Sequence, residues 1–325
     1  MFTLRFDMRA PATGAPAADL YQAALEMTAW CETRGAASVL VCEHHMSPDG
    51  YLPSPLTMLA ALAARTTAIR MMAGVFLLPL YNAVRLAEEM CVIDILSKGR
   101  TTFIGAVGYR PAEYEMYGVD FHKRGTLAEK NLALLVRAVK GEPFEYEGRR
   151  IHVTPAPFTP GGPPIMWGGG SIPAARRAGR YGIGFLAQRG DSHLREAYED
   201  EARASGRPPG LCILSPADAA GVVFVSDDLD QAWEELGPYL MHDVLGYAAW
   251  NEGTEGISSI SFAKTAAELR AENRSHRILT VEKAIAFVKA GTPLLLHPLI
   301  GGLPPQVAWR YLQTVVEKVI PAVAG

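Results

Sequence analysis

Apolar runs and amphipathic segments alternate along the whole chain. Eight apolar runs predict β-strands, at residues 2–9, 38–45, 69–78, 101–108, 164–170, 183–188, 219–228 and 293–301. Each run is followed by a segment with helical periodicity, most clearly at 82–99, 123–141 and 304–320. Because the strands are almost continuously apolar, we expect a parallel sheet that helices cover on both faces.

Eight strand–helix units favour an α/β protein with a (β/α)₈ (TIM) barrel. Two breaks in the rhythm indicate insertions: a hairpin and Pro/Gly-rich loop at 143–164, after the fourth strand, and an excursion at 248–276, after the seventh. The alternative is a doubly wound open sheet, but "RAPATGAP" after the first strand lacks the expected G-x-G-x-x-G. Since such barrels commonly reach this length, we expect residues 1–325 to form a single domain.

Composition narrows the class of protein further. Hydrophobic residues make up 49% and charged residues 20% of the chain, and the formal net charge is -3 without a basic run. This charge pattern argues against nucleic-acid binding. The N-terminus has no signal-peptide pattern, and no apolar run approaches 18 residues, so we expect a cytoplasmic protein without a membrane partner. None of the four cysteines falls in a CxxC pair, which favours buried thiols.

Polar and glycine residues gather where the predicted strands end, which is where barrels of this type carry their chemistry. Glu43, His44 and His45 follow the second strand, residues 108–110 the fourth and 168–171 the fifth, while His297 lies in the eighth. Neighbouring strand residues point to opposite faces, so His44 and His45 cannot both address one ligand. We therefore expect no metal there; one histidine should face the barrel mouth, unless it only fills the wall.

The "GGGS" turn after the fifth strand suggests a phosphate site. Gly169 and Gly170 let the backbone approach a ligand closely, and the helix that follows Ser171 offers unpaired N–H groups. A plain helix cap is the alternative for Ser171. Arg110 and Arg124 follow the fourth strand and could add positive charge, with surface salt bridges as their alternative.

Several motifs, in order, resemble the bacterial luciferase-like family of flavin-dependent oxidoreductases. They are "EHH…DG…P", "LLPLYNAVRLAEEMCVIDILSKGR", "GYRPAEYEMYGVD", "GRRIHVTP" and "PPIMWGGGS", within residues 1–190. The resemblance implies a barrel, usually dimeric, that binds reduced FMN or the deazaflavin coenzyme F-420. It also implies a non-prolyl cis peptide at about Gly74-Val75 supporting the flavin ring, and a histidine near flavin and substrate at His44.

The resemblance also assigns the region of the ribityl-phosphate tail. Gly108, Tyr109, Arg124 and the stretch from Gly169 through Gly170 to Ser171 match it. The sequence departs from the luciferase α-subunit in three places. Ala106 replaces a reactive cysteine beside the flavin, Val107 an arginine, and Asn82 a histidine. These departures argue against light emission and leave phosphate binding to other groups, such as Arg110.

The resemblance implies a monooxygenase that uses reduced FMN and O₂ on a small organic substrate, with His44 as acid or base. Because the chain shows no dinucleotide fingerprint, a separate NAD(P)H-dependent flavin reductase is the expected partner, and the protein itself is expected to be a homodimer. Alternatives are deazaflavin-dependent hydride transfer, a catalytically silent flavin-binding homologue, or a non-flavin barrel enzyme. Loops 46–53, 109–123 and 244–276 should shape the substrate pocket.

Overall fold

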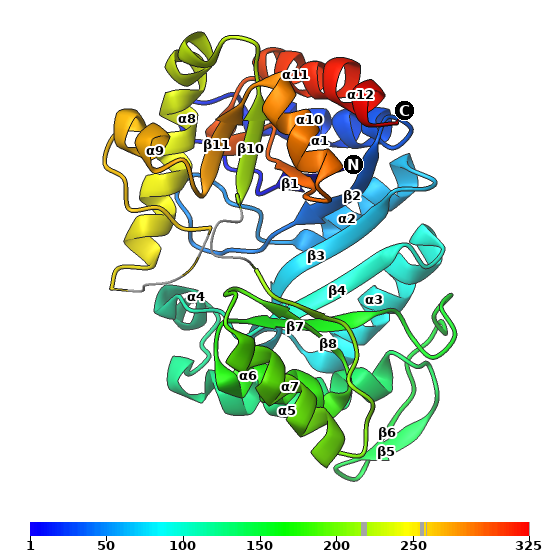
Figure 1. Ribbon diagram of the computed structural model, residues 1–325. Helices are drawn as coiled ribbons and strands as arrows, with labels where there is room; N and C mark the ends of the chain where they lie inside the picture. The colour runs from blue at the N-terminus through cyan, green and yellow to red at the C-terminus, as the bar shows by residue number, and fades with distance from the viewer. Residues whose placement is uncertain (216–219, 254–256, 258, 325) are drawn as a thin grey trace. The chain divides into compact units, whose positions relative to one another are not determined.

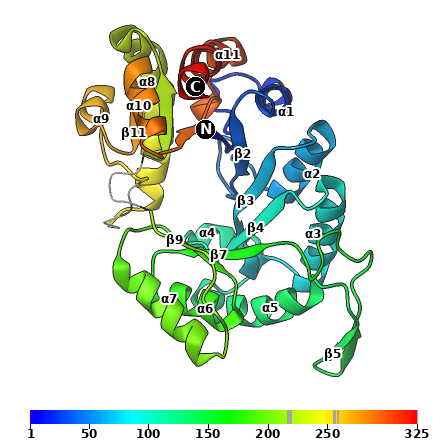
Figure 2. The same cartoon turned by 45° about the vertical axis from the view of Figure 1, so that its right-hand side comes forward.

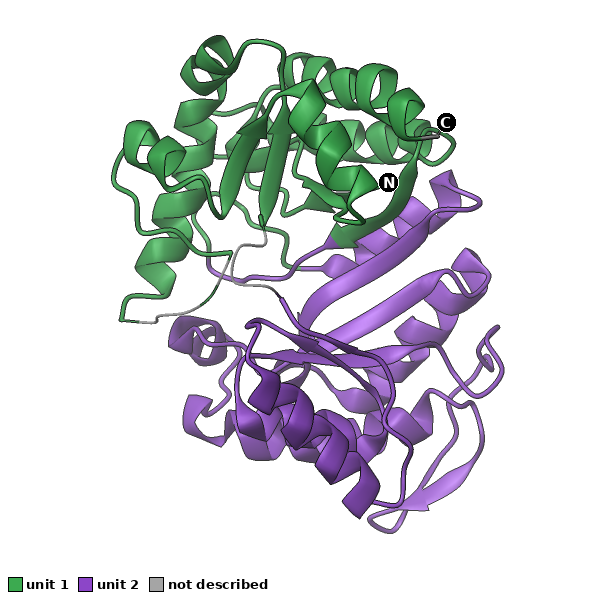
Figure 3. Ribbon diagram, in the orientation of Figure 1, with its two compact units in different colours: residues 1–40, 47–53, 216–325 green, residues 41–46, 54–215 purple. Residues whose placement is uncertain are grey.

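The computed structural model describes residues 1–215, 220–253, 257 and 259–324 (Figure 1). The chain forms two compact units, which Figure 3 shows in green and purple. The first comprises residues 1–40, 47–53 and 216–325, and the second comprises residues 41–46 and 54–215. The expectation of one domain over 1–325 stays a prediction.

The first unit is built on parallel strands in the order β11-β10-β12-β1-β2. Leu4 of β1 pairs with Leu296 of β12, and Val223 of β10 pairs with the same residue. The elements, in chain order, are β1 (Phe2–Phe6), α1 (Ala17–Cys31), β2 (Ala36–Val41), β10 (Val222–Val225), α8 (Leu229–Trp250), α9 (Ala266–Glu272), β11 (His276–Leu279), α10 (Val281–Lys289), β12 (Leu294–Leu296), η3 (Ile300–Gly302), α11 (Pro305–Thr314), the π-helical segment η4 (Val315–Val319) and α12 (Ile320–Ala324).

The second unit repeats the same design, with parallel strands in the order β3-β4-β7-β8-β9. Helices α6 and α7 pack on one another, and α6 packs on β7 and β8; the antiparallel β5–β6 hairpin projects from this unit (Figure 2). The elements are α2 (Pro55–Arg65), β3 (Arg70–Leu77), η1 (Leu78–Leu80), α3 (Ala83–Ser97), β4 (Thr101–Ala106), α4 (Pro111–Met116), η2 (Phe121–Lys123), α5 (Arg124–Ala138), β5 (Phe144–Tyr146), β6 (Arg149–Ile151), β7 (Ile165–Gly169), α6 (Ile172–Tyr181), β8 (Gly184–Ala187), α7 (Ser192–Ala204) and β9 (Cys212–Ile213).

All eight predicted strand segments contain strands, namely β1, β2, β3, β4, β7, β8, β10 and β12, and the hairpin predicted at 143–164 is present as β5–β6. The strands β9 and β11 and the helices α4 and α9 were not predicted. Each of these four elements has seven residues or fewer, which is too short to establish a period. Part of the excursion predicted at 248–276, including residues 254–256 and 258, lies outside the described residues.

Helix α3 illustrates how local sequence sets an element's ends. The side chain of Asn82 accepts hydrogen bonds from the backbone N–H groups of Val84 and Arg85, at 3.0 and 3.2 Å. These bonds satisfy donors that the first helical turn leaves open. The helix ends at Lys98, in the left-handed conformation with φ 53°, followed by Gly99. Both boundaries agree with the prediction of a helix from 82 to 99. No helix in the described parts of the chain is both long enough and apolar enough to cross a membrane.

Candidate functional site

Three titratable side chains lie buried just past the end of β2. Glu43, His44 and His45 are 2%, 7% and 4% exposed. The two histidines turn to different partners: Nδ1 of His44 lies 2.7 Å from Oε1 of Glu113, and Nε2 of His45 lies 2.8 Å from Oε1 of Glu43. The two imidazoles therefore bond to different carboxylates, and the expectation that they cannot both address one ligand stays a prediction.

Glu113 is the centre of the His44 network. It lies on α4, is fully buried, and also accepts hydrogen bonds from the backbone N–H of His45 at 3.0 Å and from Nη1 of Arg110 at 3.1 Å. The same Arg110 nitrogen donates to the carbonyl of His45 at 2.6 Å. Arg110, expected as a phosphate ligand, thus belongs to the histidine network. Sequence reasoning missed Glu113 because residues 109–123 were interpreted as a loop.

The charges in this network define the proton positions. Burial lowers the pKa of His44 despite the opposing effect of Glu113. Burial alone would raise the pKa of Glu113, but its bonds to His44 and the nearby Arg110 outweigh burial and hold that pKa below its usual value. At neutral pH a neutral His44 therefore donates from Nδ1 to an ionised Glu113. The lone pair is then on Nε2, which lies 3.3 Å from the hydroxyl of Tyr109.

The second network, around Glu43, connects the end of β2 to the end of β3. Glu43 Oε2 accepts from the backbone N–H of Leu77 at 3.2 Å and from the hydroxyl of Tyr81 at 2.9 Å. Burial raises the pKa of Glu43. His45, held by Glu43, approaches the hydroxyl of Tyr117 with Nδ1 at 3.4 Å. These are structural partners, as expected for Glu43 and for one of the two histidines.

The peptide bond between Gly74 and Val75 in β3 is cis, which confirms the predicted non-prolyl cis peptide. The pairing of β3 with β4 shifts register next to this bond. Val75 packs closely on β7, because a Cβ added to Gly168 would lie 2.9 Å from Val75 Cγ1. Past this point β4 ends at the buried Ala106, and Gly108 follows with φ 72°. A glycine therefore lies inside β3 at the cis bond, and small residues lie at the ends of β4 and β7.

The "GGGS" turn joins β7 to α6, as predicted. Gly169, Gly170 and Ser171 precede the ten-residue helix, and the Ser171 hydroxyl accepts from the backbone N–H of Ala174 at 3.4 Å. Ser171 therefore caps the helix with its hydroxyl oxygen, as the alternative interpretation predicted. Its proton can still be donated to a ligand. Pro173 has no N–H, and the N–H groups of Ala174 and Ala175 bond to Ser171, so the start of α6 offers an anion mainly the positive end of the helix dipole and the amides that precede Pro173.

A basic side chain, Arg189, lies beside this turn. A Cβ added to Gly170 would lie 3.4 Å from Oε1 of Gln188 and 3.5 Å from Nε of Arg189. Arg189 was missed, although it follows β8 by two residues and the strand-end rule could have found it. Arg124, in contrast, donates to the carbonyl of Phe121 at 2.9 Å and its guanidinium lies over that ring. Arg189 is therefore the arginine that the structure brings to the turn.

The match of the sequence to a family model shows which family the chain belongs to. The model of the luciferase-like monooxygenase family matches residues 2–295, and the chain belongs to this family.

The matches to curated relatives cover only part of each relative's own length. Two uncharacterized proteins of Sinorhizobium fredii (strain NBRC 101917 / NGR234), y4vJ and y4wF, are 29% and 31% identical over 138 residues, 42% of this chain in each case. The matches span 39% and 40% of those proteins, about two fifths. The 4-hydroxyprotoasukamycin monooxygenase of Streptomyces nodosus subsp. asukaensis is 26% identical over 288 residues, which cover 82% of this chain and 75% of that enzyme.

Solved structures share the fold. The monooxygenase RslO1 from Streptomyces bottropensis has a TM-score of 0.77 at 18% identity, covering 99% of both chains. The oxygenating constituent of 3,6-diketocamphane monooxygenase from Pseudomonas putida, in complex with FMN, has a TM-score of 0.68 at 19% identity. The match covers 99% of this chain and 98% of that chain. The coenzyme F-420 dependent tetrahydromethanopterin reductase of Methanopyrus kandleri has a TM-score of 0.66 at 16% identity, and the match covers 98% of both chains. The predicted α/β barrel class is confirmed by these likenesses.

Proposed function

We propose that the protein is a flavin-dependent monooxygenase that uses reduced FMN and O₂ to oxidise a small organic substrate. The observation that carries the proposal is the buried His44–Glu113 pair, joined at 2.7 Å, with Nε2 of His44 beside the Tyr109 hydroxyl. Membership of the luciferase-like monooxygenase family supports the reaction class. The likeness to an FMN complex supports the choice of flavin.

The side chains and glycines of the second unit fit a flavin phosphate. Gly169, Gly170 and Ser171 would meet the phosphate with backbone N–H groups and a hydroxyl proton, and Arg189 adds positive charge. Arg124 would contribute to the tail, as the family resemblance implies. This set of donors suits a dianionic group on a narrow backbone turn.

The ring of the flavin would lie among the small residues at the strand ends. Gly74 and Val75 would support it at the cis peptide, and Ala106, Gly108 and Tyr109 would border it. Reduced FMN, when bound, would supply the electrons for a reaction in which one oxygen atom enters the substrate and the other leaves as water.

His44 would hold and move protons at the reacting centre. Nε2 carries the lone pair, because Nδ1–H is donated to Glu113. The imidazole can therefore accept a proton at Nε2 and return it, while Glu113 stabilises the charged form in between. Arg110 and the backbone of His45 hold Glu113 in place. Deazaflavin-dependent hydride transfer with F-420 is the second candidate, supported by the likeness to the reductase of Methanopyrus kandleri.

The same proposal includes two partners. A separate NAD(P)H-dependent reductase would supply reduced FMN, since the Pseudomonas putida relative is described as an oxygenating constituent. A second copy of the chain would cover α3, whose outer face exposes Val92, Ile95 and Leu96 at 42%, 38% and 48%. These positions lie on one helical face, as an apolar helix-to-helix contact requires.

The test replaces His44 with alanine and compares it with His193→Ala, a matched change at an exposed histidine. If His44 transfers protons, turnover of a substrate that the unmodified protein oxidises should fall by about 10² to 10⁴-fold. Affinity for reduced FMN should change little, because the phosphate donors lie at another strand end. If His44 has only a structural role, its replacement by alanine should instead lower the free energy of unfolding by about 1–3 kcal/mol. Full activity per folded molecule in His44→Ala would defeat the catalytic assignment.

A further inference from the structure

A second cluster of titratable side chains belongs to the first unit, whereas the residues assigned to the flavin belong to the second. Asp7 follows β1, His297 follows β12, and Asp243 lies on α8; they are 0%, 0% and 2% exposed. Strands β1 and β12 are paired in parallel, so their carboxyl ends lie side by side. One carboxylate oxygen from each aspartate and one ring nitrogen of His297 lie within 4.8 Å of one another.

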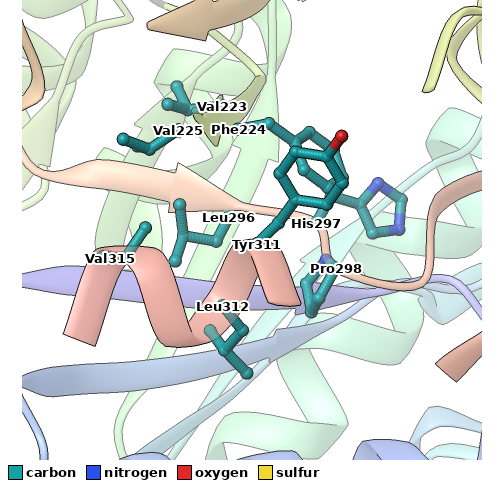
Figure 4. Close-up of a pocket in the computed structure, with 9 residues that line it drawn as sticks. All are labelled: Val223, Phe224, Val225, Leu296, His297, Pro298, Tyr311, Leu312 and Val315. Atoms are coloured by element: carbon teal, nitrogen blue, oxygen red, sulfur yellow. The ribbon is translucent and has the colours of Figure 1, made fainter. Parts of the chain in front are cut away.

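Polar atoms of this cluster lack hydrogen bonds. Among the described residues, neither ring nitrogen of His297 has a hydrogen-bond partner, and neither does Oδ2 of Asp7. Nε2 of His297 approaches Oδ1 of Asp7 to 3.4 Å, but without the geometry of a hydrogen bond. Figure 4 places the His297 imidazole at the edge of an apolar pocket lined by Val223, Val225 and Leu296, which offer it no polar contact. Buried polar groups in folded proteins are nearly always satisfied, so an unpartnered imidazole here points to a missing ligand.

Charged side chains surround the cluster. Asp243 contacts Nη1 of Arg9 at 3.3 Å and Nε2 of His276 at 3.0 Å, and Arg9 also contacts a further carboxylate, Asp49. Both oxygens of Asp243 therefore already have a partner, whereas Oδ2 of Asp7 has none among the described residues.

We propose that Asp7, Asp243 and His297 bind a divalent transition-metal cation of the Zn²⁺ or Mn²⁺ class. Two carboxylate oxygens and one imidazole nitrogen match the ligand preference of such ions, which accept mixed oxygen and nitrogen donors. The cation would engage Asp7 and His297, which have polar atoms without a hydrogen-bond partner among the described residues, and Asp243, whose oxygens also bond to Arg9 and His276. It joins β1, β12 and α8, three segments far apart in sequence, and so has a structural role. Its ligands are 236 and 54 residues apart (243 − 7 and 297 − 243), so no sequence spacing reveals the site.

The test measures metal binding directly on the full-length chain. Protein freed of metal with a chelator is titrated with Zn²⁺ and with Mn²⁺ by isothermal calorimetry, and bound Mn²⁺ is followed by electron paramagnetic resonance. We expect one ion per chain and a rise in melting temperature, since a ligand that binds only the folded state stabilises it. Absence of binding by both ions would overturn the proposal.

Three variants locate the site. Asp7→Asn keeps the shape of the side chain, and we expect it to weaken metal binding by at least about 10-fold, a typical loss for a ligand-shell change. If this variant does not fold, His297→Gln decides the question in the same way. His242→Gln is the matched control: His242 bonds to Asp49 at the edge of the cluster but is not a proposed ligand. Equal loss in the control, or unchanged affinity in both ligand variants, would contradict the assignment.

Discussion

Replacing Glu113 with glutamine tests how the protein controls the proton on His44. The change preserves the size of the side chain but removes its charge. Oε1 of Glu113 accepts from His44 at 2.7 Å, from the backbone of His45 at 3.0 Å and from Arg110 at 3.1 Å. The amide oxygen of glutamine can accept the same three hydrogen bonds, although Arg110 loses its anionic partner, so the fold should survive. Glu113 is thus a positioning residue whose charge acts through His44.

The magnitude follows from the difference between charged and neutral hydrogen bonds. A bond to a charged group contributes roughly 1.5–3 kcal/mol, and a neutral one roughly 0.5–1.5 kcal/mol. The protonated form of His44 therefore loses about 1.4 kcal/mol of stabilisation in Glu113→Gln, which equals about one pH unit. Burial already lowers the pKa of His44 and Glu113 opposes that shift, so removing the carboxylate lowers this pKa further.

The assay is the pH dependence of kcat/KM, measured by substrate oxidation with reduced FMN supplied by a reductase. We expect the acid limb that reports His44 to move to lower pH by about one unit in Glu113→Gln. Glu113→Asp keeps the charge and should restore most of the original profile. Glu115→Gln, an exposed change on the same helix, is the control and should leave the profile in place. If the acid limb of the kcat/KM profile lies at the same pH in Glu113→Gln as in the unmodified protein, the reasoning is refuted.

Three further predictions concern other parts of the molecule. The pKa values of Asp7 and Asp243 lie below those of the unfolded chain, near 3.9, so the unfolded state binds protons first as the pH falls. The free energy of unfolding should therefore decrease below about pH 5, by up to about 1.4 kcal/mol per pH unit for each group, whereas a flat denaturation series would count against these pairs. Leu96→Glu should turn a dimer into monomers in light scattering; a persistent dimer would move the interface away from α3. Gly169→Val would place a Cβ 2.7 Å from Ala174 Cβ, and the affinity for reduced FMN should fall by about 10-fold or more. An unchanged affinity would show that the turn does not bind the phosphate.

Local sequence patterns predicted those features that depend on neighbouring residues. The boundaries of α3 follow from Asn82 and Gly99, which act within one helical turn. The family resemblance added the cis peptide at Gly74-Val75, which the structure contains, and the assignment of His44 to the site, which stays a prediction. The turn between β7 and α6 follows from three glycines and a serine between a strand and a helix, and its binding of a phosphate stays a prediction.

The missed features depend on contacts between distant segments. Glu113 lies 69 residues from its partner His44, on a six-residue helix too short to show a period. Arg110 was assigned to phosphate because its charge was visible and its partners were not, yet it binds the carbonyl of His45 and Glu113. The site at Asp7 and His297 depends on strand pairing that brings the two chain ends together. The sequence shows the residue types, but it does not show which distant residues come into contact in the fold.

The central claim is that this chain binds reduced FMN for oxygen chemistry. The most direct measurement is an anaerobic titration of the flavin-free protein with reduced FMN and, separately, with reduced F-420, followed by calorimetry. We predict saturation at one reduced FMN per chain, with a lower Kd than for reduced F-420, and rapid reoxidation once O₂ is admitted. Binding of F-420 alone, or of neither cofactor, would contradict the account.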